Sequence, residues 1–579
     1  IRLTKLLINY KTVSNYYEND TYDAIVVGTG ISGGWAAKEL SEKGFKTLVL
    51  ERGRMVKHIE DYPTMNDDPW DYKFKGQLTR EEEKRQQKQS RTGYTTNKAS
   101  AHWFVDDIKH PYNETKRFDW MRGYHVGGRS IMWGRHSYRL SDLDFTANKT
   151  DGHGVDWPIR YKDIAPWYDY VESFIGVSGE NLGLSQLPDG KFLPQMPLNC
   201  VEDHLKKSMA ENFTDGRVLT AGRVAHITGD KKFEGRSNCQ FRNRCIRGCP
   251  YGGYFSSNSS TLPAAERTGN MTLRPNSVVH EVVYDPETKL ATGVKIIDAE
   301  TKEKIEFKAN VIFLCASAIA STSILMQSKS DRFENGMGND SGELGHNVMD
   351  HHFKAGASGK YDGFKDQYYK GRKPNGIYLP RFRNINGSDN LGFIRGYGYQ
   401  GGAGRGDWSE SIAEASYGKE LKEAIVKPGG WTMGLMGFGE TLPYHENKMT
   451  LDYNKTDEWG LPTVTFDAEF KENELKMRED MVAQAVEMLE KGGFKDIQGY
   501  DDIGAPGLGI HEMGTARMGR DPKTSVLNGN NQVHAVKNVY VTDGAFMTSA
   551  GCQNPSLTYM AMTARAADHA SKNFKKSNA

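Results

Sequence analysis

The chain has 579 residues, and 37% of them are hydrophobic, which is enough for a sizeable core and for more than one domain. Its 75 basic and 74 acidic side chains leave a formal net charge of +1, and no block of Lys or Arg forms a stripe that could follow a phosphate backbone. This balance excludes an electrostatically driven nucleic-acid binder. No apolar run approaches the roughly 20 residues of a membrane helix, so we expect no direct membrane span.

A strand–helix–strand pattern begins after a polar, tyrosine-containing arm at residues 1–20. Residues 23–27 form a short apolar strand, and a glycine turn, a helix ending near Gly44 and a second strand at 46–50 follow. This β-α-β order predicts a parallel sheet and an α/β fold.

Further elements follow along the chain. Residues 73–100 are highly charged, and we interpret them as a solvated helix or loop, with a lid or partner surface as the alternative. The later patterns are paired strands at 279–301, a buried strand at 311–316, a helix at 319–327, strands at 376–382, 431–439 and 448–452, and an amphipathic helix at 472–491. The strands of the aromatic- and glycine-rich region 346–470 predict an antiparallel sheet in a second domain.

The first glycine turn has the spacing of a dinucleotide-binding loop. Gly28 suits the tight turn, Gly30 allows a pyrophosphate to approach the backbone, and Gly33 allows the helix to pack closely on the strand. The N-terminus of the helix then faces the phosphates, and Glu51 at the end of the second strand can accept the ribose hydroxyls. The alternative is an ordinary glycine-rich turn, and the motif alone does not separate FAD from NAD.

Two distant segments favour FAD. Residues 125–134 form a second glycine-rich loop, and residues 539–544 form a strand that ends in an acidic residue and a glycine. A nicotinamide enzyme does not need such remote loops, whereas a flavin must be held along its whole length.

These motifs resemble those of the glucose–methanol–choline (GMC) oxidoreductases over almost the whole chain. The first glycine loop is followed, in the order of that family, by VGGRSIMWG at 126–134, LCASAIASTSILMQS at 314–328, HEMGTARMG at 511–519 and VTDGAFMTSAGCQNPSLTYMAMT at 541–563. The resemblance implies a Rossmann-like FAD-binding domain interleaved with an α+β substrate domain that contains an antiparallel sheet. The implied parts are the arm 1–20, FAD-domain segments 21–160, 226–345 and 501–579, a connecting segment 161–225 and a substrate domain 346–500.

The resemblance also implies where FAD is held. The adenine would lie near Val279 and the isoalloxazine ring against residues 127–134. Some members attach FAD through a histidine, and because Met132 stands at that position here, the cofactor would be non-covalent. The implied cofactor residues are Gly28, Gly30, Ile31, Ser32, Gly33, Glu51, Arg52, Gly127, Gly128, Ser130, Met132, Trp133, Gly134, Val279, Ala316, Asp543, Gly544, Asn554 and Pro555.

The catalytic pair of the family would fall on His511 and Asn554. The resemblance implies that His511 accepts the alcohol proton while hydride leaves for flavin N5, and that Asn554 holds the same hydroxyl. Each residue has a simpler interpretation. A histidine before a short turn is often a satisfied core residue, and Asn554 followed by Pro555 is a good helix start with Asn as the N-cap.

A group of cysteines stands apart from the general family pattern. Cys239, Cys245 and Cys249 are close in sequence, and Pro250 follows them. A zinc site would lack a fourth ligand, and a disulfide would leave one thiol over. Three thiolates suit a [3Fe-4S] cluster, with free structural cysteines as the alternative.

The cysteine segment resembles the cluster-binding stretch of bacterial FAD-dependent sugar dehydrogenases. This resemblance implies a dehydrogenase that passes single electrons from flavin through the cluster to an external carrier such as a cytochrome c. A small accessory subunit and a bacterial periplasmic rather than cytoplasmic location are further expectations.

The expected substrate is a sugar or glycoside, with the C3 hydroxyl of glucosides preferred. Oxidation of glucose at C1, of fructose or of gluconate is the alternative within the family, and a cluster-free oxidase that makes hydrogen peroxide is another. A lyase with a structural FAD and a non-enzymatic flavin carrier are the rivals from other classes. A metal site at Asp350-His351-His352 is a last candidate, but neighbouring residues of an extended segment point apart, so we interpret this segment as structural.

Overall fold

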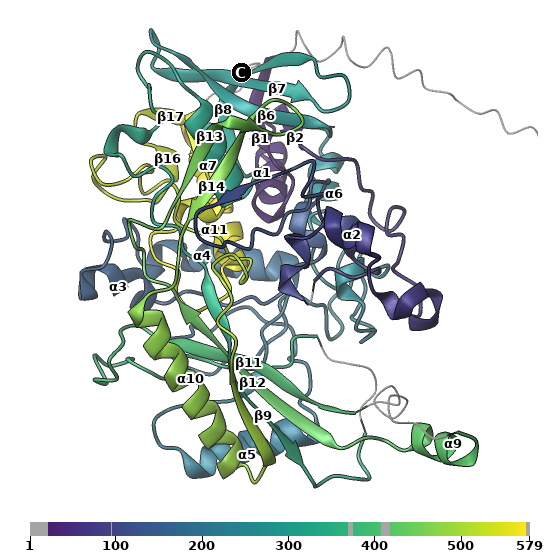
Figure 1. The fold of residues 1–579 in the computed structure, drawn as a ribbon. Helices are drawn as coiled ribbons and strands as arrows, with labels where there is room; N and C mark the ends of the chain where they lie inside the picture. The colour runs from purple at the N-terminus through teal and green to yellow at the C-terminus, as the bar shows by residue number, and fades with distance from the viewer. Residues whose placement is uncertain (1–20, 94, 369–373, 407–416, 575–579) are drawn as a thin grey trace, which may run out of the picture.

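The computed structural model describes residues 21–93, 95–368, 374–406 and 417–574, so the predicted arm at 1–20 lies outside the described residues. The molecule has two large β-sheets, and Figure 1 shows the first in the upper half and the second in the lower half. Each sheet has its own hydrophobic core. The predicted combination of an α/β fold with an antiparallel sheet is confirmed.

Within the described residues, the first sheet has eight strands drawn from distant parts of the chain. Its main path is β16 (Gln532–Val533), β17 (Val536–Val541), β8 (Lys304–Leu314), β1 (Thr21–Val27), β2 (Thr47–Leu50) and β5 (Met271–Arg274), and the hairpin of β6 (Ser277–Asp285) and β7 (Leu290–Asp298) joins it at β8. β1 is parallel to both β2 and β8, and Val27 pairs with Leu50 and Leu314. The carboxyl ends of these strands therefore meet at one edge, where α/β proteins bind their ligands.

Helices cover this sheet because their apolar residues face it. Helix α1 (Ile31–Glu42) follows β1 directly, and its residues from Ser32 to Ser41 are buried. Helix α11 (Ser556–Asn573) packs against α1 and α4, and most of its residues from Leu557 to Ala570 are buried. The remaining helices are α2 (Arg80–Arg85), α3 (Asp142–Asp151), α4 (Tyr161–Ile175), α5 (Cys200–Asn212), α6 (Thr261–Arg267), α7 (Ala318–Gln327), α9 (Lys419–Val426) and α10 (Glu472–Lys491).

The second sheet is antiparallel and, in the described residues, has six strands. Its order is β15 (Lys495–Asp501), β9 (His351–Tyr361), β12 (Trp431–Glu440), β11 (Tyr397–Arg405), β10 (Ile377–Leu379) and β4 (Thr220–Ala221). Helix α10 lies along this sheet in Figure 1 and buries Met477, Met481 and Met488 against it. The bounds predicted for this helix, 472–491, are those of α10.

One predicted strand joins a different sheet. β13 (Lys448–Thr456) pairs with β14 (Pro462–Asp467), which in turn pairs with β3 (Asn113–Glu114). Phe466 stacks on Phe118 at 4.0 Å between ring centroids, so this hairpin packs on a separate apolar cluster instead of the core of the second sheet. The prediction that 448–452 belongs to the second sheet was wrong for that reason.

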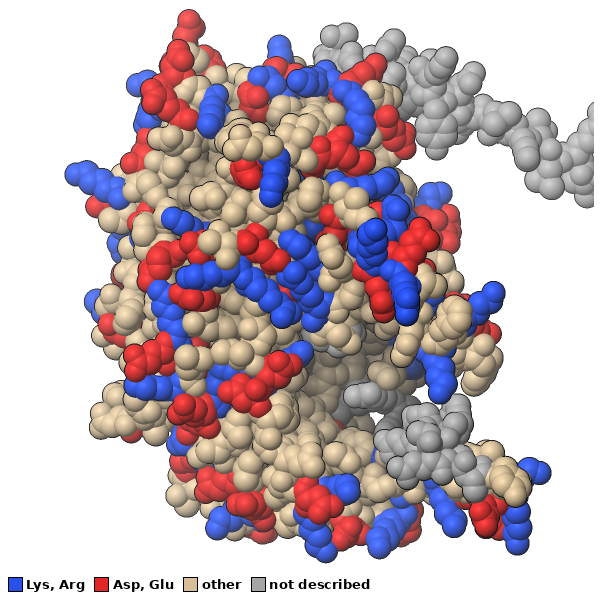
Figure 2. Space-filling view, in the orientation of Figure 1, with Lys and Arg blue, Asp and Glu red and all other residues tan. Residues whose placement is uncertain are grey.

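The charged segment 73–100 contains the short helix α2, none of whose residues is buried. Figure 2 shows acidic and basic side chains interspersed over this face of the molecule, with a recess between its two halves. Among the described helices, none is both long and apolar enough to span a bilayer.

Candidate active site

One cavity of about 1670 Å³ lies between the two sheets and contains most of the predicted site. Both predicted catalytic residues, His511 and Asn554, line it. The predicted cofactor residues that line it are Gly28, Gly30, Ile31, Ser32, Glu51, Arg52, Gly128, Ser130, Met132, Trp133, Gly134, Val279, Ala316, Asp543, Gly544 and Asn554. Gly33, Gly127 and Pro555 do not line it.

The first glycine loop forms a backbone cradle in this cavity. Gly28 has φ +96°, and a Cβ there would lie 2.6 Å from the carbonyl oxygen of Cys315. A Cβ on Gly33 would lie 1.9 Å from the carbonyl oxygen of Gly28, which explains why the helix needs glycine where it meets the turn. A Cβ on Gly30 would meet no atom within 4 Å, so the loop opens onto free space at the N-terminus of α1.

The second glycine loop closes the cradle from the other side. The backbone N–H of Gly127 donates to the hydroxyl of Thr29 at 2.9 Å, and the hydroxyl of Ser257 donates to the carbonyl of Gly30 at 2.9 Å. A Cβ on Gly128 would lie 3.5 Å from the Cα of Gly30, so the two loops face each other at van der Waals distance. Two segments that are distant in sequence therefore make one opening at the N-terminus of α1.

Glu51 and Arg52 lie at the far end of the cradle. One carboxylate oxygen of Glu51 accepts from the backbone N–H of Thr29 at 3.1 Å, and the other accepts from that of Gly53 at 3.0 Å. A carboxylate has further lone pairs for ribose hydroxyls, as the sequence predicts. Arg52 turns away to an ion pair with Asp457 at 2.9 Å and stacks on Trp459 at 4.5 Å.

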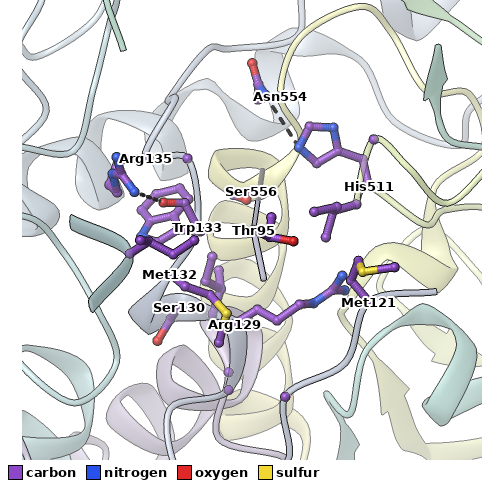
Figure 3. A pocket seen from close by; sticks show the side chains of 18 of the residues that line it. Thr95, Met121, Arg129, Ser130, Met132, Trp133, Arg135, His511, Asn554 and Ser556 are labelled. Atoms are coloured by element: carbon purple, nitrogen blue, oxygen red, sulfur yellow. Dashed lines mark hydrogen bonds between the residues drawn. The ribbon is translucent and has the colours of Figure 1, made fainter. Parts of the chain in front are cut away.

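The remaining part of the cavity is lined by residues of the segment 129–133 and by the predicted catalytic pair. Figure 3 shows Met132 and Trp133 on the left of the view, His511 on the right, Asn554 at the top and the Arg129 side chain running across the lower part toward Met121. Arg129 makes a two-point ion pair with Glu512, at 2.7 and 3.1 Å. The hydroxyl of Tyr559 lines the cavity and is buried with no hydrogen-bond partner among the described residues, so it is available to a bound group.

His511 and Asn554 face each other, as the sequence predicts for a catalytic pair. Asn554 Nδ2 lies 3.5 Å from His511 Nε2, and its Oδ1 accepts from the amide of Gln400 at 2.7 Å. Burial, with the nearby His351, Arg129 and His136, holds the pKa of His511 well below its usual range, so the ring is neutral. A neutral imidazole in this place can accept a proton.

The helix-start interpretation of Asn554 was wrong by one position. Helix α11 begins at Ser556 with Pro555 as its N-cap, and no side chain caps it. The Asn554 amide therefore hydrogen-bonds across the cavity instead of to the helix.

Asp350 holds the loop that carries His511. Its carboxylate accepts from the backbone N–H groups of Gly507 at 2.8 Å, Gly509 at 2.8 Å and His511 at 3.1 Å. Burial, followed by the nearby charge of Glu512, raises the pKa of Asp350 to about 7. A Cβ on Gly509 would lie 2.5 Å from Asp350 Oδ1, so the loop needs glycine there.

His351 gives the Asp350-His351-His352 segment a part in the site that the sequence does not reveal. Its Nδ1 lies 2.8 Å from His511 Nδ1, whereas both ring nitrogens of the buried His352 lack partners among the described residues. No group of His, Cys, Asp or Glu in the described part of the chain is arranged to hold a metal ion. Gln400 was also missed, because its strand is glycine-rich and a lone glutamine carries no signal.

The cysteine segment lies beside the cavity, and Cys245 lines it. All three thiols are free and partly exposed, and the N–H of Phe241 lies 3.5 Å from Cys239 Sγ. Burial raises the pKa of Cys239 to about 11, and the nearby Cys245 and Cys249 act in the same direction. The thiols are therefore neighbours, but in the described residues they do not form the ligand arrangement that the sequence predicts.

Comparisons with known proteins agree with this geometry. The chain is 27% identical over 96% of its length, and 96% of the relative, to 2-methyl-1,2-propanediol dehydrogenase of Mycolicibacterium austroafricanum. It is 23% identical to the fructose dehydrogenase large subunit of Gluconobacter japonicus, over 94% of this chain and 97% of that protein. It is 24% identical to the gluconate 2-dehydrogenase flavoprotein of Pantoea cypripedii, over 95% and 93%.

A solved structure shares the fold. The crystal structure of pyridoxine 4-oxidase from Mesorbium loti superposes with a TM-score of 0.57 at 16% identity, over 94% of this chain and 98% of that chain. GMC oxidoreductase profiles match residues 22–353 and 443–563. The chain therefore belongs to the GMC oxidoreductase family.

Proposed function

We propose that this protein is an FAD-dependent dehydrogenase that oxidises an alcohol group of a sugar or glycoside. The observation that carries the proposal is the neutral, half-buried His511, which faces Asn554 in the same cavity as the glycine cradle. Family membership implies FAD, and the open space at Gly30 and the unpartnered hydroxyl of Tyr559 fit such a group. Bound there, FAD would supply the acceptor for a hydride from the substrate carbon.

The protein side chains would handle the proton and the orientation of the substrate. His511 Nε2 would take the hydroxyl proton as the C–H bond breaks, and the Asn554 amide would donate to the same hydroxyl oxygen. The hydride would carry two electrons and one proton away from the substrate carbon, and the hydroxyl proton would stay on His511.

For the substrate, we propose the C3 hydroxyl of a glucoside. The polar side chains of Gln400 and His136 line the cavity near the catalytic pair, which suits a ligand with several hydroxyls. The fructose and gluconate dehydrogenases among the relatives support sugar oxidation. The propanediol dehydrogenase favours a small vicinal diol as the second candidate.

For the exit of electrons, we propose a [3Fe-4S] cluster on Cys239, Cys245 and Cys249. The position of Cys245 in the cavity wall supports a short path from the flavin, and the proximity of the other two thiols supports shared ligation. The segment would have to adjust as the cluster forms. The electrons would then pass to a one-electron carrier such as a cytochrome c, with a small accessory subunit and a periplasmic location as further parts of the proposal.

An anaerobic visible spectrum before and after addition of methyl glucoside tests the proposal. Flavin bands that bleach over a broad iron–sulfur shoulder are expected. Bleaching without the shoulder would leave hydride transfer standing and remove the cluster. The dehydrogenase assignment would be wrong if the flavin were bleached by none of three kinds of substrate: methyl glucoside, other sugars and 1,2-propanediol.

The electron exit has its own test in Cys245→Ser. Flavin reduction by the sugar should stay within about twofold of the unmodified protein, while turnover with a one-electron acceptor should fall at least tenfold, because a thiolate ligand is lost. Cys200→Ser is the matched control, since Cys200 lines the same cavity but lies at the start of α5, outside the cysteine segment. Equal turnover of the two variants would make the cysteines structural.

A further inference from the structure

We propose that His351 is a positioning residue that fixes the ring tautomer of His511, so that Nε2 of His511 is the atom that accepts the substrate proton. The proposal rests on the proposed function and adds to it a residue from the start of β9. His351 does not line the cavity, so it acts through His511.

The hydrogen bonds of His351 determine which of its nitrogens carries hydrogen. Its Nε2 lies 2.8 Å from the carbonyl oxygen of Gly551. A carbonyl can only accept, so Nε2 of His351 carries the hydrogen and donates it. In a neutral ring the other nitrogen, Nδ1, then has a lone pair and can only accept.

His351 in turn determines which nitrogen of His511 carries hydrogen. The Nδ1 atoms of the two rings are 2.8 Å apart, and the rings meet nearly edge to face at 82°. Because His351 Nδ1 accepts, His511 Nδ1 must donate. Its Nε2 is then left without hydrogen, and this is the nitrogen that faces Asn554.

A second chain of contacts reaches the same atom from the opposite side. The amide nitrogen of Gln400 lies 2.7 Å from Asn554 Oδ1, so the oxygen of Asn554 accepts and its Nδ2 points toward His511 Nε2. An amide nitrogen donates, and it is compatible only with a ring nitrogen that has a lone pair. If the side-chain amides of Gln400 and Asn554 were both flipped, Asn554 Oδ1 would face His511 Nε2, and that nitrogen would have to carry hydrogen. The hydrogen bond from His351 to Gly551 excludes this, because it leaves the hydrogen of His511 on Nδ1.

Both histidine rings are neutral, so each carries one hydrogen on its two nitrogens. Burial lowers the pKa of His351 to about 4, although its hydrogen bond to Gly551 and the charge of Glu440 act in the opposite direction. His351 is 1% exposed, so its ring is shielded from bulk solvent. Neither ring is therefore protonated on both nitrogens near pH 7.

The backbone fixes the two rings relative to each other. Asp350, next to His351, accepts from the backbone N–H of His511 at 3.1 Å. Met349 and Met513, which flank the pair, hydrogen-bond to each other through both backbone groups at 3.0 Å. The contact between the rings is therefore held by flanking backbone bonds as well as by its own hydrogen bond.

Loss of this contact has a defined chemical consequence. Without an acceptor at Nδ1, His511 can place its hydrogen on Nε2, where it would point at the substrate hydroxyl and could not take its proton. A wrong tautomer of a catalytic histidine costs up to about 10⁴-fold in rate in a well-studied protease. We expect a smaller loss of about 10²-fold here, because the correct tautomer stays partly populated.

His351→Gln and His351→Met form a matched test. The two side chains have similar length and volume, but only glutamine can donate to Gly551 and accept from His511. We expect His351→Met to slow anaerobic flavin reduction by methyl glucoside about 10²-fold at saturating substrate, with FAD content unchanged, and His351→Gln to recover at least tenfold of that loss. If the two variants are equally fast or equally slow, His351 only fills space and the proposal is wrong.

A measurement independent of activity tests the tautomer itself. The protein labelled with ¹⁵N in its histidine rings should show His511 Nε2 as an unprotonated nitrogen and Nδ1 as a protonated one, with His511→Gln identifying the signals. Hydrogen on Nε2 would overturn the proposal even if both His351 variants failed to fold. If no alcohol reduces the flavin of the unmodified protein, the proposed function fails, and the ring measurement still decides the tautomer.

Discussion

The two walls of the cavity are built in different ways. The cofactor wall is made of backbone, where Gly28, Gly30 and Gly128 bring two turns together and few side chains take part. The catalytic wall is made of side chains, and each contact joins distant segments: His351 and His511 are 160 residues apart, and Gln400 and Asn554 are 154 apart. On the cofactor wall the separations vary more: Thr29 and Glu51 are 22 residues apart, whereas Gly127 is 98 residues from Thr29 and Ser257 is 227 residues from Gly30.

This difference decides what a substitution should do. A glycine of the cradle is needed for space, so a change there acts through steric overlap on folding or on cofactor binding. A residue of the catalytic wall is needed for a proton or a hydrogen bond, so a change there should leave FAD bound and act on rate. The predictions below separate these two kinds of effect.

The largest effect is expected for His511→Ala. Removal of a general base typically costs about 10²–10⁴-fold, so flavin reduction by methyl glucoside should fall by that factor while FAD stays bound. Stopped-flow absorbance measures the rate, and the flavin-to-protein absorbance ratio measures cofactor content. His445→Ala is the control, because that ring is 58% exposed and lies away from the cavity. An unchanged rate in His511→Ala would remove this residue from the mechanism.

The next effect separates two glycines of one motif. Gly33→Ala places a Cβ 1.9 Å from a backbone oxygen, so the free energy of unfolding should fall by about 1–3 kcal/mol and FAD should be lost as the turn shifts. Gly30→Ala meets no protein atom within 4 Å, so the stability of the protein without FAD should change by less than about 0.5 kcal/mol.

FAD affinity provides the contrast between these two variants. The new methyl group of Gly30→Ala would occupy the space left for the pyrophosphate, so affinity should fall at least tenfold despite normal stability. Flavin fluorescence titration and thermal unfolding of the two apoproteins measure these quantities. If Gly30→Ala bound FAD normally, the free space at Gly30 would not be the phosphate site.

The smallest expected effect is the dependence of folding stability on pH. Burial lowers the pKa of His351 to about 4 and that of His136 to about 3, both from 6.5. Between pH 4 and 6.5 the unfolded chain therefore binds protons on these rings that the folded protein does not, and stability rises with pH through this window. Each ring should contribute on the order of 1–3 kcal/mol, measured as the thermal midpoint at a series of pH values.

Asp350 acts in the opposite direction and provides the comparison. Its pKa is raised from 3.8 to about 7, so the folded protein retains a proton there that the unfolded chain loses, and stability falls as pH rises through that range. Asp350→Asn should therefore make the rise in stability between pH 4 and 6.5 steeper. An equal slope in both proteins would mean that Asp350 is already ionised in the folded state at pH 4.

Much of the fold follows from local patterns. The spacing of Gly28, Gly30 and Gly33 between two apolar strands predicts the cradle, although only Gly33 meets a steric limit within the motif itself. The 472–491 helix was predictable because its apolar face repeats with helical spacing and Gly492 follows its end. Strand β11 was not predicted, since its sequence YGYQGGAGR is rich in glycine, and its neighbours β10 and β12 stabilise it.

The catalytic wall was only partly predictable. His511 and Asn554 were found through family motifs, whereas Gln400, Asp350 and His351 have no local signal. Their roles arise from hydrogen bonds that exist only once the two sheets meet. The cysteine segment shows the same limit, because close spacing in sequence predicts proximity of the thiols but not the arrangement of a ligand set.

The position of β17 in the first sheet has a consequence for how the enzyme is made. β17 pairs with β8, and β8 pairs with β1, so the last of the described strands to be synthesised completes a sheet that the first of them begins. At about 5–20 residues per second, a ribosome needs roughly half a minute to two minutes between the two. During that time the nascent chain has only an incomplete cofactor site, so FAD should be loaded after release from the ribosome. Prematurely terminated chains should accumulate as flavin-free targets for proteolysis.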